Sequence, residues 1–186
     1  MPAVFLLSPA NLAGKRGQLL LDPRGASALA QRLRTPAGAP LGEVFSFVSS
    51  LYFRGKLAYA QAFGQSPPGP LVMTAGGGLL PPDEPVTLSR LQGWSSVAIH
   101  HDNPHFTAPL IRQATALLDA SSPETRFVLL GSVASRKYTV PLHEVFGERL
   151  LFPAQFEGLG DMSRGSLLLK AVAAGRELVY RSLEPI

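Results

Sequence analysis

Short apolar runs alternate with amphipathic helical segments along most of this chain, and this alternation restricts its fold more than any other feature. The runs Ala3–Leu7, Leu71–Ala75 and Phe127–Leu130 have the length and composition of buried strands. Strands that are covered by helices on both sides are expected to be continuously apolar, as these are. We therefore predict one α/β domain over residues 1–186, Rossmann-like, with a mostly parallel central sheet and helices on both faces.

The expected helices are marked by start and stop residues. In Thr107–Ala120, Thr107 can cap the first turn and Pro109 suits that turn. In Ser163–Ala174, Asp161 is a candidate cap and Gly175 a candidate stop. The other expected helices are Ala26–Leu33, Leu51–Phe63 and Pro141–Phe146. The other expected strands are Val44–Val48, Ser96–Ile99, Leu150–Phe152 and Leu178–Arg181.

Composition excludes several classes of protein. A hydrophobic content of 46% supports an ordered core, and the absence of cysteine excludes disulfides, thiolate nucleophiles and Cys-ligated metal sites. The first residues lack the basic segment of a signal peptide, and no apolar run is long enough for a membrane span, so we expect a cytoplasmic protein without membrane contacts. The net charge is a modest +4. Its cations occur in short groups: Lys15 with Arg16, Arg32 with Arg34, Arg54 with Lys56, and Arg136 with Lys137.

Candidate ligand-binding residues follow from the rule that ligands of open α/β sheets sit beyond the carboxyl ends of the strands. That rule selects Ser8–Asn11, Gly76–Gly78, Gly131–Tyr138 and Gly158–Arg164. In the last segment, glycines precede a helix start that offers free N–H groups to an anion. Asp161, Ser163 and Arg164 are its candidate ligand-binding residues. The alternative is a flexible turn followed by a capped helix.

Gly131–Tyr138 follows the clearest strand and groups hydroxyl, cationic and phenolic side chains. Its candidate ligand-binding residues are Ser132, Ser135, Arg136 and Tyr138. They suit phosphate, ribose or peptide backbone groups, although a polar loop with a half-buried Tyr138 is the alternative. We expect Arg136, Ser163 and Arg164 to converge on one cleft.

Other motifs are incomplete. Tyr52 and Lys56 have the Tyr-x-x-x-Lys spacing of short-chain dehydrogenases, but the N-terminal glycine motif of those enzymes is absent. The favoured interpretation is an amphipathic helix whose cations extend to solvent, with Tyr52, Arg54 or Lys56 contributing to a binding surface as the alternative.

Two further sequence segments do not fit the cofactor or metal sites that they partly match. Gly76–Gly78 is followed by no helix, so it does not fit a nucleotide-binding loop. The histidines 100, 101 and 105 around Asp102 could suit zinc, but Asn103-Pro104 interrupts them and disfavours a shared helical face. We therefore assign no residue a catalytic role, and we expect the protein to bind neither a metal nor a cofactor.

Three strings resemble those of the YaaA-like peroxide-stress proteins. They are Ser8-Pro9-Ala10, Met162-Ser163-Arg164 and the segment 130–138. The resemblance implies an α/β protein with affinity for nucleic acid, and it transfers no catalytic residue.

The sequence predicts a binding or accessory protein, because no nucleophile–base pair, metal set or cofactor loop is complete. We expect it to hold an extended or anionic ligand, a peptide by preference, for a partner enzyme. The alternative is a nucleotide- or nucleic-acid-binding protein with N-glycosidase-type activity, in which Asp161 or Asp83 is the acid/base and Tyr138 stacks on a base. A deep pocket with a carboxylate favours the enzyme, and a shallow groove beside a strand edge favours the peptide. Assembly as a homo-oligomer stays open.

Overall fold

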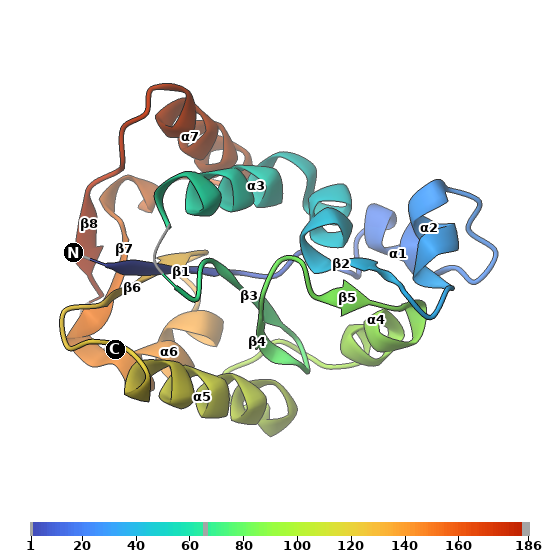
Figure 1. The fold of residues 1–186 in the computed structure, drawn as a ribbon, viewed down its shortest axis with the longest axis horizontal. Helices are drawn as coiled ribbons and strands as arrows, with labels where there is room; N and C mark the ends of the chain where they lie inside the picture. Colours follow the sequence, from blue (N-terminus) through green and yellow to red (C-terminus); the bar gives the residue numbers. More distant parts are fainter. Residues whose placement is uncertain (1, 65–66, 184–186) are drawn as a thin grey trace.

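A six-stranded sheet forms the centre of the computed structural model, which describes residues 2–64 and 67–183 (Figure 1). The strand order is β4-β3-β1-β6-β7-β8. The strands are β1 (Ala3–Leu7), β3 (Leu71–Thr74), β4 (Gly78–Leu80), β6 (Arg126–Leu130), β7 (Leu150–Pro153) and β8 (Tyr180–Ser182). The four inner strands are parallel, and the edge strands β4 and β8 run antiparallel to their neighbours. The predicted α/β fold with a mostly parallel sheet is confirmed.

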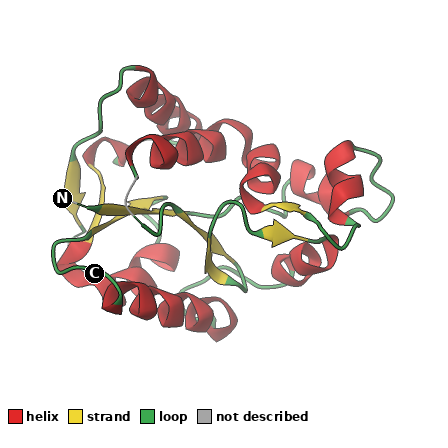
Figure 2. Ribbon diagram, viewed as in Figure 1, coloured by secondary structure: helices red, strands yellow, loops and turns green. Residues whose placement is uncertain are grey.

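Helices cover both faces of this sheet, as Figure 1 and Figure 2 show. The helices α3 (Leu41–Phe63) and α7 (Asp161–Ala173) lie on one face, and α5 (Pro104–Asp119) and α6 (Arg136–Phe146) lie on the other. The side chains of the fully apolar strand β1 alternate between the two apolar cores, one on each face of the sheet. Phe5 and Leu7 pack in one apolar cluster, and Val4 and Leu6 pack in the other. Successive side chains of a strand point to opposite faces, so a run buried on both sides must be apolar throughout.

A smaller unit adjoins one end of the sheet (Figure 1). It contains α1 (Lys15–Leu21), α2 (Ala28–Leu33), α4 (Leu88–Ser95) and the short antiparallel pair β2 (Ala39–Pro40) and β5 (Pro85–Val86). Short 3₁₀ turns at Gly147–Arg149 and Ala154–Phe156 flank β7. In the described part of the chain, no helix combines the length and apolar character needed to span a bilayer.

The register of the sheet determines which loops meet. Leu7 of β1 lies opposite Leu130 of β6, and the backbone N–H of Ser8 donates to the Leu130 carbonyl over 3.1 Å. The segments that follow these strands therefore leave the same edge of the sheet side by side. The loop after β3 leaves the same edge, since β3 is parallel to β1.

Two predicted strands were wrong. Residues 44–48 belong to α3, where Leu41, Val44 and Phe45 are buried at the spacing of a helical face. Residues 96–99 form an irregular segment that follows α4.

Three helix boundaries also differ from the expectation. The helix α5 begins at Pro104 rather than at Thr107, with Asn103 accepting from the His105 N–H. No helix spans both His101 and His105, as the Asn103-Pro104 pair predicts. The helix α6 begins at Arg136 and contains Pro141 in its interior. Gly160, rather than Asp161, is the N-cap of α7, and it makes no side-chain capping bond.

Candidate functional site

A cavity of about 640 Å³ opens where β1, β3 and β6 end. Ser8, Ala75 and Ser132, which follow these strands closely, all line it. The end of α4 and the segment 96–99 that follows it form another wall. Small-molecule sites typically have volumes of roughly 300–1,000 Å³, so this cavity has the size of a ligand site.

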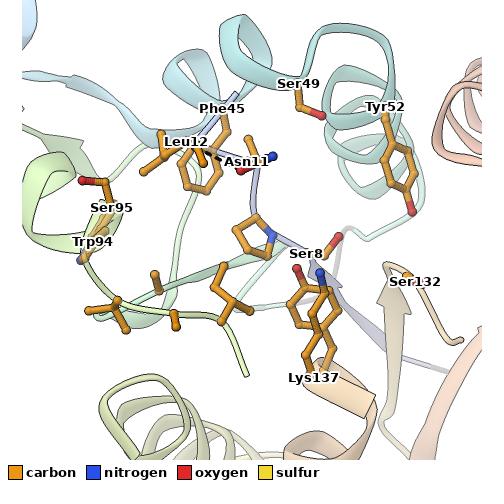
Figure 3. Close-up of a pocket in the computed structure, with 18 of the residues that line it drawn as sticks. Ser8, Asn11, Leu12, Phe45, Ser49, Tyr52, Trp94, Ser95, Ser132 and Lys137 are labelled. Atoms are coloured by element: carbon orange, nitrogen blue, oxygen red, sulfur yellow. Dashed lines mark hydrogen bonds between the residues drawn. The ribbon is translucent and has the colours of Figure 1, made fainter. Parts of the chain in front are cut away.

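Aromatic side chains form much of the apolar wall. They are Phe45 and Tyr52 of α3, Trp94 of α4 and Tyr138 of α6. Figure 3 shows Phe45, Tyr52 and Trp94 arranged around one space, with Ser8 at its floor. Rings from separate elements offer flat surfaces on which a planar ligand can stack.

The polar lining consists mainly of hydroxyl groups and two charges. The hydroxyl groups belong to Ser8, Ser49, Ser95, Ser96 and Ser132. Lys137 enters from the first turn of α6, and Asp161 is the first residue of α7. Figure 3 shows Lys137 reaching toward Ser8. The first turn of α6 offers backbone N–H groups and a positive dipole end on the same side.

Lys56 lies behind Ser8 and is almost completely buried, with 1% of its surface exposed. Its Nζ lies 2.7 Å from the Ser8 carbonyl oxygen and 2.8 Å from Ser8 Oγ, and it donates to both. The same nitrogen lies 4.3 Å from the centre of the Tyr52 ring and 5.1 Å from that of Phe53. The lysine therefore joins the middle of α3 to the end of β1.

Burial lowers the pKa of the Lys56 ammonium from 10.5 to about 7. The negative charge of Asp161 opposes this shift, and the positive charge of Arg164 adds to it. Near neutral pH a substantial fraction of the molecules therefore carries an uncharged amine at this position. Its lone pair can accept the proton of the Ser8 hydroxyl.

The Tyr52 hydroxyl has no acceptor for its proton among the described residues. Its oxygen is buried next to the Arg164 side chain, which donates toward it, and Tyr52 lines the cavity. Burial raises the pKa of Tyr52 to about 12, with the charge of Arg164 opposing the rise. The phenol is therefore protonated at neutral pH and can donate a hydrogen bond.

Arg164 fixes the start of α7 against α3. Its Nε donates to the Phe156 carbonyl over 3.2 Å, its guanidinium lies over the Phe156 ring, and its Nη1 lies 3.5 Å from Asp161 Oδ1. The two helices touch where Gly55 faces Gly165. A Cβ on Gly165 would lie 2.9 Å from the Leu51 carbonyl oxygen, so glycine permits the approach.

A break in α3 separates two groups of lining residues. Ser50 has φ 44° and ψ −113°, a conformation that costs energy for any residue with a side chain. Phe45 and Ser49 precede this break, and Tyr52 follows it. The break turns both halves of the helix toward one cavity.

The structure brings some of the predicted ligand-binding residues together. Ser132, Tyr138 and Asp161 line the cavity. Ser135 caps α6 by accepting from the Lys137 N–H, and Arg164 is buried against Phe156. The side chains of Arg136 and Ser163 are exposed and lie outside the lining, so the expected cleft of Arg136, Ser163 and Arg164 is not formed at this cavity. Any role of these two in binding stays a prediction.

Sequence reasoning gave too little weight to Lys56 and Ser8. The spacing of Tyr52 and Lys56 correctly places both on one helical face, but that face points inward. The interpretation of Lys56 as a cation extending to solvent is wrong, whereas Arg54 is exposed as that interpretation requires. The signal was the apolar neighbourhood of Lys56, since Phe53, Tyr59 and Ala60 share the buried side of the helix.

The histidine group lies elsewhere. His100, His101 and Asp102 each offer one ligand atom, and these atoms lie within 4.8 Å of one another. The His100 Nδ1 already accepts the backbone N–H of Asp102 over 3.2 Å, and His100 and Asp102 are exposed. His105 does not belong to the group. The absence of a metal stays a prediction.

Comparison of the chain with protein-family models, with curated proteins and with solved structures finds no match in any of the three. The resemblance to the YaaA-like proteins therefore stays a prediction, and the geometry of the cavity carries the functional argument.

Proposed function

We propose that the chain binds a small molecule that combines a flat ring with one anionic group, such as a nucleoside monophosphate. The observation that carries this proposal is the cavity itself, which joins aromatic walls to a lysine at a helix start. Such a ligand is anionic, as the first sequence-based hypothesis expects, and it is a nucleotide, as the alternative hypothesis expects.

The aromatic walls support the ring. Trp94 comes from α4 of the smaller unit and Tyr138 from α6, which covers one face of the sheet. Stacking on such rings stabilises a bound base by roughly 1–3 kcal/mol. The serine hydroxyls of the lining offer hydrogen bonds to the edges of a base or to a ribose.

Lys137 and the first turn of α6 support the anionic group. A lysine next to a helix start combines a full charge with backbone N–H donors. Asp161 on the same wall repels a second anion, so a ligand with a single anionic group fits better than a polyphosphate.

The structure gives less support to a peptide that pairs with the edge strand β4. The Leu79 N–H donates to Gln113 Oε1, and Gln113 Nε2 donates to the Gly77 carbonyl over 3.2 Å. These backbone groups at the edge are already bonded to α5. The geometry therefore favours the cavity, with its Asp161 carboxylate, over strand addition at β4.

Trp94 provides a direct test, because it is the one tryptophan of the chain and it lines the cavity. Adenosine, guanosine, cytidine and uridine monophosphates are titrated while Trp94 fluorescence is recorded. We expect saturable binding that Lys137→Met weakens about tenfold, because a hydrogen bond to a charged group contributes about 1.4 kcal/mol or more. Arg136→Met is the matched control, since its side chain is the neighbouring exposed cation outside the lining.

The nucleosides without phosphate should bind equally to the wild type and to Lys137→Met. Equal affinity of both variants for the monophosphates would contradict the anion site. A fluorescence response to acidic peptides alone, with none to nucleotides, would replace this proposal with the peptide-binding one.

A further inference from the structure

We infer that Ser8 and Lys56 form a nucleophile–base pair that cleaves a carboxylic ester within a ligand held in the cavity. The inference rests on the proposed function, because the substrate must first enter that cavity. Since a nucleoside monophosphate has no carboxylic ester of its own, the substrate is an acyl ester of such a ligand, formed on a ribose hydroxyl. Ser8 Oγ lies 2.8 Å from Lys56 Nζ, and Ser8 lines the cavity. A side-chain nucleophile within hydrogen-bond reach of a base is the minimum arrangement for covalent catalysis.

Several contacts fix the position of the Ser8 hydroxyl. The Ser8 N–H is bonded to Leu130, and the Ser8 carbonyl accepts from Lys56 over 2.7 Å. Gly131 lies beside the hydroxyl, where a Cβ would stand only 3.1 Å from Ser8 Oγ. Glycine therefore leaves the space next to the nucleophile unfilled.

The surroundings of Lys56 suit a base. The amine is enclosed by Tyr52 and Phe53, and the charged groups that act on it are Asp161 and Arg164 of α7. Apolar enclosure favours the uncharged form, which is the form that can take a proton. Lys137, by contrast, is only half-buried at the cavity wall, with its Nζ 4.9 Å from the centre of the Tyr138 ring.

The Tyr52 hydroxyl can stabilise the developing negative charge. It is buried, its proton has no acceptor within the described residues, and it belongs to the ring that flanks Lys56 at 4.3 Å. A donor that is free before the reaction can bond the carbonyl oxygen as that oxygen becomes an oxyanion.

The reaction balances with water as the co-reactant. Ser8 Oγ forms a bond to the carbonyl carbon, and its proton moves to Lys56 Nζ. The ester C–O bond then breaks, and the leaving alcohol takes the proton from Lys56. Water attacks the acyl-Ser8 carbon, gives a proton to Lys56, and releases the carboxylic acid as Ser8 Oγ recovers that proton.

Charge distinguishes an ester from a phosphoryl substrate at Ser8. Phosphoryl transfer requires several cations or metal ions around the transferred group. Arg164 is committed to Phe156 and Asp161, and Lys137 is the cation that lines the cavity among the described residues. A single oxyanion needs fewer donors, and Tyr52 can supply one.

Phenylmethanesulfonyl fluoride tests the pair in the full chain. Ser8 Oγ forms a bond to sulfur, the S–F bond breaks, fluoride leaves, and the proton moves to Lys56. We expect one added phenylmethanesulfonyl group, located on Ser8 by peptide mass spectrometry. The labelling rate should rise with pH through about 7 as Lys56 loses its proton.

Three variants separate the roles. Lys56→Met should slow labelling at least 100-fold, since a general base contributes roughly 10²–10⁴-fold. Tyr52→Phe should slow it about tenfold. Ser89→Ala, at an exposed serine of α4 outside the cavity lining, should label as fast as the wild type. A label on another residue, or a flat pH profile between pH 5 and 9 in the wild type, would overturn the pair even if Lys56→Met failed to fold.

Ester hydrolysis and nucleotide binding are then measured in separate assays. The wild type should hydrolyse 4-nitrophenyl acetate through acetyl-Ser8, and Ser8→Ala should not. Labelling without turnover would overturn the ester assignment. If nucleotides bind, as Trp94 fluorescence reports, but phenylmethanesulfonyl fluoride does not label Ser8, the Ser8–Lys56 pair is overturned and the proposed ligand class stands. If Ser8 is labelled but no nucleotide slows the labelling, the proposed ligand class is overturned and the pair stands.

Discussion

At the scale of single residues, Lys56 carries the largest electrostatic cost on the cavity side of α3. An ammonium with 1% of its surface exposed loses most of its hydration, and its contacts with Ser8 and the Tyr52 ring offset part of that loss. The remaining cost appears as a pKa of about 7 in place of 10.5. Protonation and folding are therefore coupled at this residue.

The stability of the protein should rise with pH between about 7 and 9. In this range the unfolded chain holds a proton on Lys56 that the folded chain has lost, so unfolding takes up one proton. Raising the pH makes that uptake less favourable and therefore stabilises the folded state. The slope should approach roughly 1 kcal/mol per pH unit. Urea unfolding at several pH values measures it.

Lys56→Met should remove most of this slope while keeping a side chain of similar length. The range ends at pH 9 because the folded-state pKa values of Tyr52, Tyr59, Tyr138 and Tyr180 are raised, mainly by burial, so tyrosine ionisation favours unfolding near pH 10. An equal slope in the variant and the wild type would contradict the buried, uncharged amine.

The candidate site could be predicted from sequence only in part. Sequence selects Ser132, Tyr138 and Asp161 as candidates because they follow strand ends or begin helices, which are local signals, and all three line the cavity. The pairing of Ser8 with Lys56 joins residues that are 48 positions apart, and only the packing of α3 on β1 creates it. No spacing in the sequence encodes such a contact.

At the scale of elements, the contact of α3 with α7 positions one wall of the cavity. Gly55 and Gly165 let the helices approach backbone to backbone, which sets Asp161 and Arg164 beside Tyr52 and Lys56. Close approach of this kind leaves no space for a methyl group.

Gly165→Ala should destabilise the protein by roughly 1–3 kcal/mol, because its Cβ would lie 2.9 Å from the Leu51 carbonyl oxygen and force the helices apart. Gly93→Ala is the control. Gly93 lies in α4 with no atom within 4 Å of the added Cβ, so alanine should stabilise by roughly 0.5–1 kcal/mol through helix propensity. Thermal melts of both variants should therefore shift in opposite directions.

The elements that sequence predicted well are those with a single clear period. Ala3–Leu7 was read as a strand over its exact length because it is apolar throughout. Residues 44–48 were misread because alternating and helical spacing overlap over so few positions, and Leu41 had to be included to show the helical face. The boundary of α6 was missed because Pro141 marks a helix start more often than a helix interior.

At the scale of the whole molecule, several cations make contacts within the fold. Arg16 donates to the Phe47 carbonyl, Arg32 pairs with Glu43 at 2.7 Å, and Lys56 is buried. These three cations come from three different groups of the sequence, and their contacts within the fold leave fewer cations to bind phosphates together.

Single-stranded DNA should therefore bind weakly and with a shallow salt dependence. Each phosphate contact lowers log K by about 0.7 per unit of log salt, and we expect a slope of about 1.5 or less for the few cations that can act together. Fluorescence anisotropy of a labelled oligonucleotide at several salt concentrations gives the slope. Tight binding with a slope above about 4 would instead indicate an extended nucleic-acid surface.

The contact of Gln113 with β4 has a consequence for self-association. An open sheet invites a second chain to pair with its edge and so to start an aggregate. On this side of the molecule the edge strand spans only Gly78–Leu80, and the Gln113 amide bonds the Leu79 N–H and the Gly77 carbonyl. A second copy would have to displace a helix side chain before it could pair there. One glutamine side chain thus hinders a second chain from adding a strand at β4 and so from starting an aggregate there.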